Sequence, residues 1–591
     1  MSLPPLVNVF AIHARHPAVL EPFVATMRAT ARFELHRPFD TWLVGIEPLP
    51  GRAPGRCQAE GRRVFFAEGE DLVVPDGEHG RSAALLRLCE LTDNAPTRLA
   101  ELPGDVGFLL VSRTHGSVVR SAAGLVPWYI HRTTEFVAVS TRLAHFSRLL
   151  PNPPGIDALV HASWTDGIVC PNARTPLVGV SAVQAGHVVK LDSDRVGSQL
   201  RYWDPARNAR DGPSLAPPAH AVRTHAEQLR SLLLARLERD LDPAGGNLLG
   251  LSGGVDSSCL AALAVGPAAM PLMTFSFLPA RHHPRLAHSL RFVDSIADLV
   301  APVRQWRIHL DEQGRLASHL RAPRLGIPVP HPALSHLVGF RNEEEIRVYT
   351  GGEFADDLFG GAFVLWHDWL RELSLLSVLQ RLPTRGRLPV RRRVPVRWVS
   401  ARWRQKLRRP MLPYRLRLPE LVRPELREEY RVWSRDRQRA MAALPSPYRY
   451  LEMSRQADGW VAQNWEVCSE LGVRRSLPFY CRDVMELAFS CSPLELAMPP
   501  KNLLRQGFRS DVPPLNLERT DKGSWTEAET VSWGSQIPDR LAGIVRSDWM
   551  QTPPLRVSLE AADVLTCLSI STEPVSSFPP ARLIKKANED P

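Results

Sequence analysis

The chain has 591 residues, several times the ~150 residues of a typical domain, so we expect two or three domains. Its composition, 44% hydrophobic and 23% charged, excludes a disordered or fibrous protein. The sequence contains no run of ~18 consecutive apolar residues, so we expect no membrane-spanning helix. The net charge is +11, but the eleven arginines and one lysine of residues 381–410 account for +12, so the rest sums to −1. This distribution excludes a generally basic, nucleic-acid-binding protein.

The start of the sequence, MSLPPLVNVFAIHARH, lacks the basic and then apolar layout of a secretory signal, which predicts a cytoplasmic protein. The eight cysteines are scattered without a C-x-x-C pair. This spacing predicts reduced, mostly buried thiols, and neither a zinc site nor a disulfide framework. Four histidines have no Cys or Glu partner at ligand spacing, so we expect them to be structural or solvent-facing. They are His282, His283, His331 and His336.

Residues 1–205 predict an antiparallel, sheet-rich domain. Short apolar runs separated by turns, such as DVGFLLVSR (105–113) and EFVAVSTRLAHF (135–146), have the rhythm of β-strands. The Pro- and Gly-bearing segment 206–218 then predicts a linker.

Residues 219–525 show a different pattern, in which strands alternate with helices. The helical spacing of 221–241 precedes the apolar strand 247–251, and further strands are expected at 271–278 and 345–351. Segments from about 450 to 510 are predicted to be helical, and 526–591 form a Pro- and Ser-rich C-terminal extension. The alternation predicts a multidomain α/β protein whose second domain is a doubly wound parallel sheet with helices on both faces.

The most specific motif is Leu-Ser-Gly-Gly-Val-Asp-Ser-Ser at 251–258, between a predicted strand and a predicted helix. Because Gly253 and Gly254 have no Cβ, the backbone can come close to a phosphate group. The helix N-terminus beyond them offers N–H groups and the positive end of the helix dipole. Asp256 is suited to hold Mg²⁺ against the phosphates. Hydroxyl donors come from Ser252, Ser257 and Ser258.

This string resembles the pyrophosphatase loop of enzymes that split ATP into AMP and pyrophosphate, and it lacks the G-K-[ST] ending of a Walker loop. Over most of its length the chain resembles the class B asparagine synthetase family. The resemblance is carried in order by AGLVPWYIHRTTEFVAVSTRLAHF (123–146), TGGEFADDLFGG (350–361) and RRSLPFYCRDVMELAFSCSPLELAMPPKNLLRQGF (474–508). It implies an N-terminal, Ntn-hydrolase-like αββα sandwich of glutaminase type, followed by an ATP-pyrophosphatase domain.

The resemblance also implies a site, position by position. Asp256 and Asp356 match the aspartates that hold Mg²⁺ on ATP, and Glu353 matches the acid that acts as base toward the attacking amine. Lys501 matches the lysine that stabilises charge on the α-phosphate and on the tetrahedral intermediate, and Lys522 is a second candidate. The adenine contacts fall at Leu251, Phe277 and Gly352. Such an arrangement suits adenylation, because a positioned cation and a metal lower the cost of negative charge at phosphorus.

Three positions depart from the family pattern. Phe354 stands where the family has a second glycine, and we expect it to narrow or reshape that wall of the site; Asp357 replaces the usual glutamate. Glutamine-dependent members expose a cysteine nucleophile after removal of Met, whereas here the second residue is Ser2. We therefore expect no glutaminase activity, and an amine that comes from the substrate itself.

Two kinds of cyclising relative lack that cysteine: β-lactam synthetases, which place tyrosine where Glu353 stands, and lasso-peptide cyclases. The prediction is a lasso-peptide cyclase that adenylates an Asp or Glu side chain of a leaderless core peptide and closes a macrolactam with its N-terminal amine. Two alternatives stay open. One is an ammonia-dependent asparagine synthetase-like or β-lactam-synthetase-like amide ligase acting on a small amino acid, and the other is a non-catalytic scaffold.

The cofactors implied are ATP and Mg²⁺. The partners implied are the core of a ribosomally made precursor peptide, a leader-binding protein and a leader peptidase, with no nucleic acid and no membrane. The segment 381–410 is either a solvated loop or a docking surface for an acidic peptide or partner protein. A nucleic-acid site is the least favoured interpretation of it, because no base-reading fold accompanies it.

Overall fold

The computed structural model describes more than half of the chain, in segments from residue 7 to residue 519. These are 7–30, 33–48, 56–59, 62–69, 78–102, 106–155, 157, 173–192, 196–197, 199–205, 219–279, 286–310, 337, 339–341, 343–360, 428, 432, 461–491, 495–496 and 500–519. The predicted linker 206–218, the Arg-rich segment 381–410 and the extension 526–591 lie outside the described residues.

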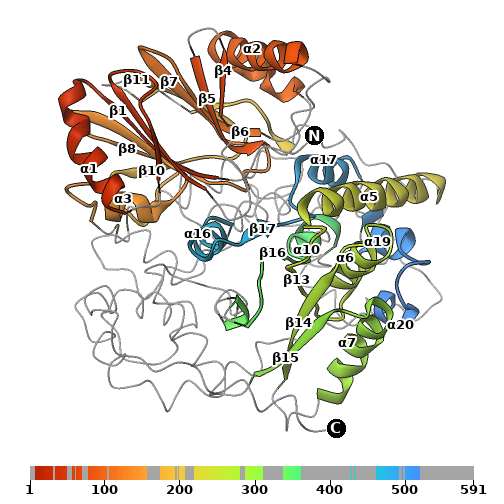
Figure 1. Cartoon of the computed structure of the whole chain (residues 1–591). Helices are drawn as coiled ribbons and strands as arrows, with labels where there is room; N and C mark the ends of the chain where they lie inside the picture. Colours follow the sequence, from red (N-terminus) through yellow and green to blue (C-terminus); the bar gives the residue numbers. More distant parts are fainter. Residues whose placement is uncertain are drawn as a thin grey trace, which may run out of the picture.

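The first 205 residues contain twelve described strands, which form two six-stranded antiparallel sheets (Figure 1). The strands are β1 (Val7–Ala14), β2 (Glu34–His36), β3 (Trp42–Pro48), β4 (Arg56–Ala59), β5 (Arg62–Gly69), β6 (Val106–Val111), β7 (His115–Val119), β8 (Trp128–Arg132), β9 (Phe136–Ser140), β10 (Val180–Val183), β11 (His187–Asp192) and β12 (Leu200–Arg201). The sheet orders are β10-β8-β9-β1-β3-β2 and β12-β11-β7-β6-β5-β4.

Helices cover the outer faces of both sheets. They are α1 (Glu21–Ala29), α2 (Glu78–Asn94) and α3 (Leu143–Leu149), with 3₁₀ turns η1 (Pro17–Leu20) and η2 (Pro96–Glu101). Strand β1 is apolar on both sides, so Val9 and Ala11 pack between the sheets while Phe10 and Ile12 pack under α1 and α3. The second sheet packs its outer face against α2 in the same way. The prediction of a sheet-rich, antiparallel first part agrees with this layered arrangement, although α3 occupies the end of the segment expected to be a strand at 135–146.

The second part is built on a five-stranded sheet in which every pairing is parallel. Its strands are β13 (Asn247–Gly250), β14 (Leu272–Pro279), β15 (Arg304–Leu310), β16 (Val348–Thr350) and β17 (Arg474–Ser476), in the order β15-β14-β13-β16-β17. The chain builds outward from β13 to β15 and then returns to place β16 and β17 on the other side of β13. The strand order therefore reverses between β13 and β16, and ligands bind outside the carboxyl ends of the strands at such a switch point.

Helices pack on both faces of this sheet, as predicted. They are α5 (Ala219–Asp240), α6 (Val255–Val265), α7 (Leu286–Val300), α10 (Ala355–Phe359), α16 (Ala462–Leu471), α17 (Arg482–Ser490), α19 (Asn502–Gly507) and α20 (Pro514–Leu517). Leu249 and Val348 belong to the core shared with α5 and α6, whereas Leu248 and Tyr349 belong to the core that contains Cys468 of α16. Strand β17 lies in a region predicted to be helical. Three residues are too short for a periodic pattern, so only the pairing with β16 defines this strand.

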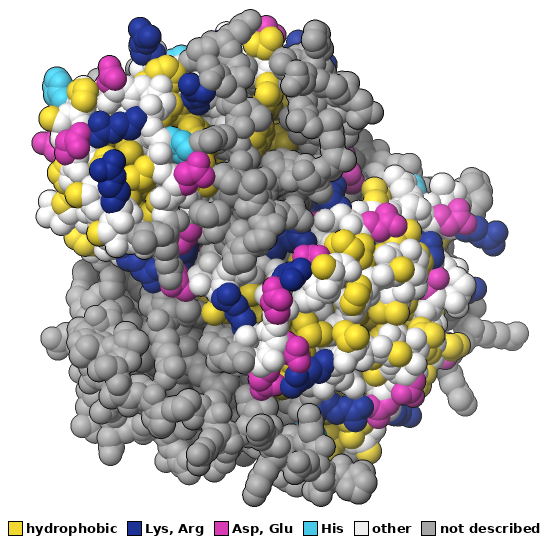
Figure 2. All heavy atoms as spheres, viewed as in Figure 1, with side chains coloured by type: hydrophobic (Ala, Val, Ile, Leu, Met, Phe, Trp, Pro, Cys, Tyr) yellow, Lys and Arg dark blue, Asp and Glu magenta, His cyan; other side chains and the backbone are white. Residues whose placement is uncertain are grey.

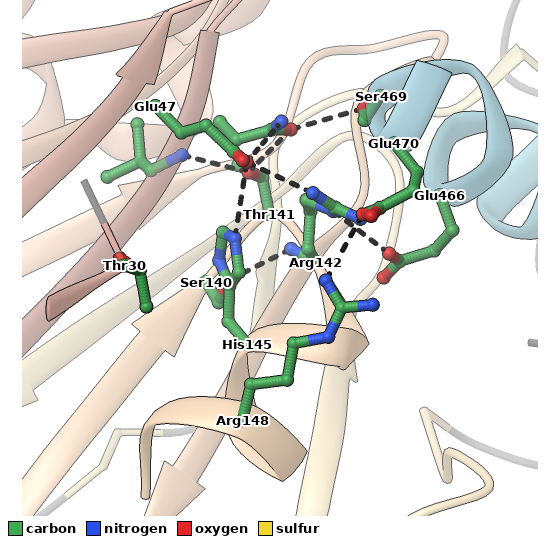
Figure 3. A network of polar contacts seen from close by, with 12 residues as sticks. Thr30, Glu47, Ser140, Thr141, Arg142, His145, Arg148, Glu466, Ser469 and Glu470 are labelled. Carbon is green, nitrogen blue, oxygen red and sulfur yellow. Dashed lines mark hydrogen bonds and ion pairs between the residues drawn. The ribbon is translucent and has the colours of Figure 1, made fainter. Parts of the chain in front are cut away.

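The two parts are joined through α16, which lies between them in Figure 1. Trp465 packs in the core between the two antiparallel sheets, and Val467, two residues later, packs against the parallel sheet. Arg142, which follows β9, is 1% exposed and donates to Glu47 Oε2 at 3.0 Å and to Glu466 Oε2 at 3.1 Å (Figure 3). One helix therefore belongs to both hydrophobic cores and to a buried ionic network.

On the described part of the face shown in Figure 2, cationic and acidic side chains are interspersed and do not gather into a field of one sign. This fits the near-neutral charge of the chain outside residues 381–410. Within the described segments, no helix combines the length and the hydrophobicity needed to span a bilayer.

Candidate functional site

Two loops meet at the switch point of the parallel sheet. One follows β13 and contains residues 251–254; the other follows β16 and contains residues 351–354. A Cβ on Gly352 would lie 2.9 Å from Asp256 Cβ and 3.1 Å from the backbone nitrogen of Ser257. The second loop therefore packs directly on the first turn of α6, an approach that only glycine permits.

The first loop leads into α6 as the sequence predicts. Gly253 has φ +67°, and a Cβ there would lie 2.7 Å from the backbone carbon of Phe292 in α7. The hydroxyls of Ser252 and Ser257 are 3.1 Å apart, and Ser252 Oγ accepts a hydrogen bond from the Gly254 nitrogen at 3.3 Å. Gly254 is the N-cap of the eleven-residue helix α6. Glycine backbone, serine hydroxyls and a helix N-terminus therefore converge where a phosphate group would bind.

Residues near the end of the described chain hold this loop in place. Asn516, in α20, donates to the carbonyl oxygens of Gly253 at 3.0 Å and Phe292 at 2.8 Å. Arg519 donates to the Ser252 carbonyl at 3.0 Å, and its guanidinium carbon lies 4.3 Å from the centre of the Phe292 ring. Sequence reasoning missed both residues, because no local motif marks a contact across more than 200 residues.

Lys501 brings the two predicted metal-binding aspartates together. Its ammonium nitrogen contacts Asp256 Oδ2 and lies 2.9 Å from Asp356 Oδ1. Burial by itself would lower the pKa of Lys501, but the charges of Asp256 and Asp356 raise that pKa above its ordinary value. The lysine is therefore a fixed cation at neutral pH. It occupies a left-handed N-cap position of α19, with φ 62°.

Both aspartates are suited to Mg²⁺. They lie in the first turns of α6 and α10, directly after the two loops at the switch point. Since both carboxylates reach the same lysine nitrogen, they are close enough to share one cation. Hard oxygen ligands of this kind, together with substrate phosphates, are what Mg²⁺ prefers. The residues present therefore fit the metal that the sequence predicts.

Glu353 follows Gly352 on the second loop, and a cation holds one of its carboxylate oxygens. Arg475, in β17, donates from Nη2 to Glu353 Oε1 at 2.7 Å and from Nη1 to the carbonyl of Tyr349 at 3.0 Å. Burial alone would lower the pKa of Arg475, but the charge of Glu353 raises it. Glu353 Oε2 is buried and has no hydrogen-bond partner among the described residues. One carboxylate oxygen is therefore fixed by a cation and the other can accept a proton.

The three predicted adenine positions lie on the first loop, on β14 and on the second loop. Leu251 donates its backbone N–H to the Phe275 carbonyl at 2.8 Å and accepts from Ser276 Oγ at 2.6 Å. Phe277 follows on β14 and makes an edge contact with Phe275, with ring centroids 5.5 Å apart. Leu251 and Phe277 are thus held by neighbouring strands, whereas Gly352 packs on the start of α6.

Phe354 does not line the site in the way we expected. It is 2% exposed and stacks on Tyr480, with ring centroids 4.1 Å apart. Its φ of 69° is the left-handed conformation that glycine adopts without cost. The chain therefore keeps the backbone shape of a glycine position and uses the side chain for core packing.

Lys522 and Ser2 lie outside the described residues. Asp357 is described and is buried in α10.

The family model described as asparagine synthase matches residues 229–536, and no curated protein matches the chain significantly. A structure titled as the allosteric regulatory enzyme of purine biosynthesis is 10% identical, with a TM-score of 0.24 over 51% of this chain and 89% of that one. A glutamine phosphoribosylpyrophosphate amidotransferase from B. subtilis is 11% identical, with a TM-score of 0.23 over 51% and 90%.

An NMN synthetase from Francisella tularensis is 14% identical, with a TM-score of 0.17 over 23% of this chain and 57% of that one. The family match covers more than half of the chain and includes both loops of the site, α16, β17 and α19. The chain therefore belongs to the asparagine synthase family and is an ATP-dependent carbon–nitrogen ligase.

Proposed function

We propose that this ligase is a lasso-peptide cyclase that activates a side-chain carboxylate of a core peptide as its acyl-adenylate and closes a macrolactam with the peptide's own N-terminal amine. The observation that supports it most is the grouping of Lys501, Asp256 and Asp356 beside a glutamate with one unpartnered oxygen. This grouping contains a cation for the first half-reaction and a proton acceptor for the second.

In the first half-reaction a carboxylate oxygen of the peptide attacks the α-phosphorus of ATP, and pyrophosphate leaves. The backbone N–H groups at the start of α6 and the hydroxyls of Ser252 and Ser257 hold the phosphates. Lys501 stays protonated because of its two aspartates, so it stabilises negative charge that builds on the α-phosphoryl oxygens. Mg²⁺, held by Asp256 and Asp356, would neutralise phosphate charge when bound.

In the second half-reaction the N-terminal amine of the peptide attacks the activated carbonyl carbon, and AMP leaves. The attacking nitrogen must lose a proton as the amide forms, and Glu353 Oε2 is the acceptor in this proposal. Arg475 keeps the other oxygen engaged, so that the free oxygen has a fixed direction. The products are a macrolactam, AMP and pyrophosphate, and the peptide loses one water in total.

The source of the amine is inferred from the first part of the chain. No cysteine occurs before Cys57, so β1 begins without the thiol that glutamine hydrolysis in this family uses. We therefore assign residues 1–205 to a glutaminase-like Ntn-hydrolase sandwich that makes no ammonia. An internal amine of the substrate then takes the place of ammonia. A leader-binding protein and a leader peptidase are the partners that such a reaction calls for, because the amine must first be freed.

ATP–pyrophosphate exchange with purified protein, Mg²⁺ and a leaderless candidate core peptide tests this function. The expected results are peptide-dependent exchange and a mass loss of one water from the peptide. An N-acetylated peptide should support exchange without losing water, and a peptide with Asn or Gln in place of the acidic residue should support neither. Asp256→Asn and Lys501→Met should both abolish exchange, whereas Lys190→Met, a lysine of the first part, should retain it.

Other outcomes would assign another reaction. Exchange driven by free aspartate, with asparagine formed from ammonia, would contradict a peptide cyclase and indicate an amino-acid ligase. Loss of exchange in Lys190→Met as well would contradict the assignment of the lysine's role to Lys501.

A further inference from the structure

A second cluster of ligand-type side chains lies away from the ATP site, at the junction of α5, α17 and α19. Its members are His225 in α5, Cys491 at the C-cap of α17 and Glu495 four residues further on. Their ligand atoms all lie within 4.8 Å of one another. Cys491 and Glu495 are buried, and the His225 side chain is 15% exposed.

The geometry of the three side chains centres on one nitrogen atom. His225 Nδ1 contacts Glu495 Oε1 and lies 3.5 Å from Cys491 Sγ. A catalytic cysteine–histidine–carboxylate triad needs the thiol and the carboxylate on opposite nitrogens of the ring. Here both face the same nitrogen. That nitrogen carries at most one proton, so it cannot serve both partners as a donor. The arrangement therefore does not form a nucleophilic triad.

A metal ion shared by the three side chains would account for this convergence. Zinc binds cysteine sulfur at about 2.3 Å and histidine nitrogen at about 2.0–2.1 Å in tetrahedral geometry, which places sulfur and nitrogen about 3.5 Å apart. The observed separation of Cys491 Sγ and His225 Nδ1 has this value. Sulfur, imidazole and carboxylate are a ligand set that zinc accepts. We propose that His225, Cys491 and Glu495 bind a divalent metal ion of the zinc type, with water completing the coordination.

The position of this site gives the metal a structural task. Asn502, the residue after Lys501, donates from Nδ2 to the carbonyl oxygen of Glu495 at 3.0 Å. A Cβ on Gly507 of α19 would lie 2.7 Å from the carbonyl oxygen of Ala226, next to His225. The ligands thus tie α5 and the end of α17 to the segment that presents Lys501. From the scattered cysteines we expected no zinc site. The sequence could not indicate this one, because its ligands are up to 270 positions apart and only the fold brings them together.

Metal content and cobalt spectroscopy test the proposal. Purified full-length protein, dialysed against metal-free buffer, should retain one zinc ion per chain. Replacement of zinc by Co²⁺ should produce the near-ultraviolet charge-transfer band that reports a cysteine sulfur ligand. Cys491→Ala should lose the band and most of the zinc. Cys481→Ala is the matched control, because Cys481 is a buried cysteine at the other cap of α17 and should keep both.

A second variant guards against misfolding as the cause of metal loss. His225→Gln keeps a polar side chain on α5, so a folded protein that has lost zinc would support the assignment. For the metal-free wild type, the unfolding midpoint should rise with added Zn²⁺, since a ligand that binds only the native state stabilises it by mass action. Asp256→Asn should keep zinc, because the proposed Mg²⁺ site is separate. Zinc retained in Cys491→Ala, or bound Co²⁺ without the sulfur band, would overturn the proposal.

Discussion

At the scale of single residues, the site separates two functions that a ligase must combine. Lys501 is a cation locked between two carboxylates, which suits charge stabilisation during adenylation. Glu353 is fixed by Arg475 at one oxygen and has no described partner at the other, which suits proton transfer during amide formation. In the proposed mechanism different side chains carry the two steps, so single substitutions should separate them.

Glu353→Gln should therefore impair amide formation and leave adenylation in place. Glutamine can still accept the hydrogen bond from Arg475, but it cannot take a proton from the attacking amine. A general base contributes about 10²–10⁴-fold, so product formation should fall by about 100-fold or more while pyrophosphate exchange changes only a few-fold. Glu345→Gln, at an exposed glutamate just before β16, is the control. Equal loss of both activities would contradict a role confined to the second step.

The adjacent glycines of the phosphate loop should respond differently to alanine. At Gly253 the new Cβ would meet the α7 backbone at 2.7 Å, and φ is +67°. Left-handed backbone costs about 1–2 kcal/mol and overpacking costs about 1–3 kcal/mol, so Gly253→Ala should lower the unfolding midpoint clearly. At Gly254 the nearest atom is the Ser252 hydroxyl at 3.2 Å, so Gly254→Ala should fold normally and weaken only ATP binding. Thermal unfolding and exchange kinetics in parallel check this, and a folded, fully active Gly253→Ala would contradict it.

At the scale of elements, α16 is fixed by charged groups from the first part of the chain. Arg142 reaches Glu47 on β3 as well as Glu466 and Glu470 on α16, the last at 2.6 Å (Figure 3). Burial alone would raise the pKa of Glu47, but His145 and Arg142 lower it to about 2. Removing one partner from such a buried network leaves uncompensated charge, which costs about 3–5 kcal/mol. The network therefore sets where α16 and the adjoining β17, with Arg475, lie.

His145 should make the stability of this network depend on pH. Burial lowers the pKa of His145 to about 4, below the ordinary value of 6.5. Between these values the unfolded chain binds a proton that the folded chain does not, so the free energy of unfolding should fall as the pH falls from 6.5 to 4. At about 1.4 kcal/mol per pKa unit the loss is about 3 kcal/mol. Denaturant unfolding of the wild type and of His145→Gln checks this, because the variant should lack this part of the slope.

Two buried glutamates also change how the free energy of unfolding depends on pH, in addition to His145. Glu47 contributes stability above its ordinary pKa of 4.5, and that contribution is lost as the pH falls toward about 2. Burial raises the pKa of Glu466, so as the pH falls the folded chain binds a proton at this glutamate before the unfolded chain does. Glu466 therefore opposes the fall in the free energy of unfolding.

His131→Gln, at a histidine on β8, is the control for the His145 variant. A wild-type slope retained in His145→Gln would contradict the assignment.

At the scale of the whole molecule, the first part serves as a support for the ligase site. Trp465 lies in the core between the antiparallel sheets, while β17 in the same stretch of chain carries Arg475. Further contacts link the parts: Trp203 donates to Glu486 at 2.8 Å and Arg482 donates to the Leu102 carbonyl at 2.9 Å. The first part thus supplies packing and polar contacts to the segments that carry the ligase site.

The described parts should consequently unfold together. Calorimetry of the full chain should show one transition for both parts, and Trp465→Ala should lower its midpoint without splitting it. Truncation of a buried tryptophan lowers the free energy of unfolding by about 3–5 kcal/mol. If the parts unfold together, this loss destabilises both hydrophobic cores. Two separate transitions in the wild type would show that the parts fold independently and would contradict this coupling.

Much of the candidate site could be predicted from local sequence. The string at 251–258 predicts a strand, a glycine turn and a helix N-terminus, and β13, the loop and α6 follow in that order. The positions of Asp356 and Lys501 came from family resemblance, and the fold brings the Lys501 nitrogen to 2.9 Å from Asp356 Oδ1. Two expectations were wrong. Phe354 was expected to reshape a wall of the site, but it adopts a glycine-like backbone conformation and its side chain packs in the core. The region of β17 was expected to be helical, because a strand of three residues leaves no periodic pattern.

The sequence by itself determined the family, the ATP loop and the alternation of strands and helices, since these depend on motifs and on periodicity along the chain. Only the tertiary structure decided which distant groups meet: Arg475 with Glu353, Asn516 with the phosphate loop, and Arg142 with α16. The physical reason is that these are single polar contacts between segments up to several hundred residues apart. No local pattern encodes such a contact, because it exists only after the sheets and helices have packed.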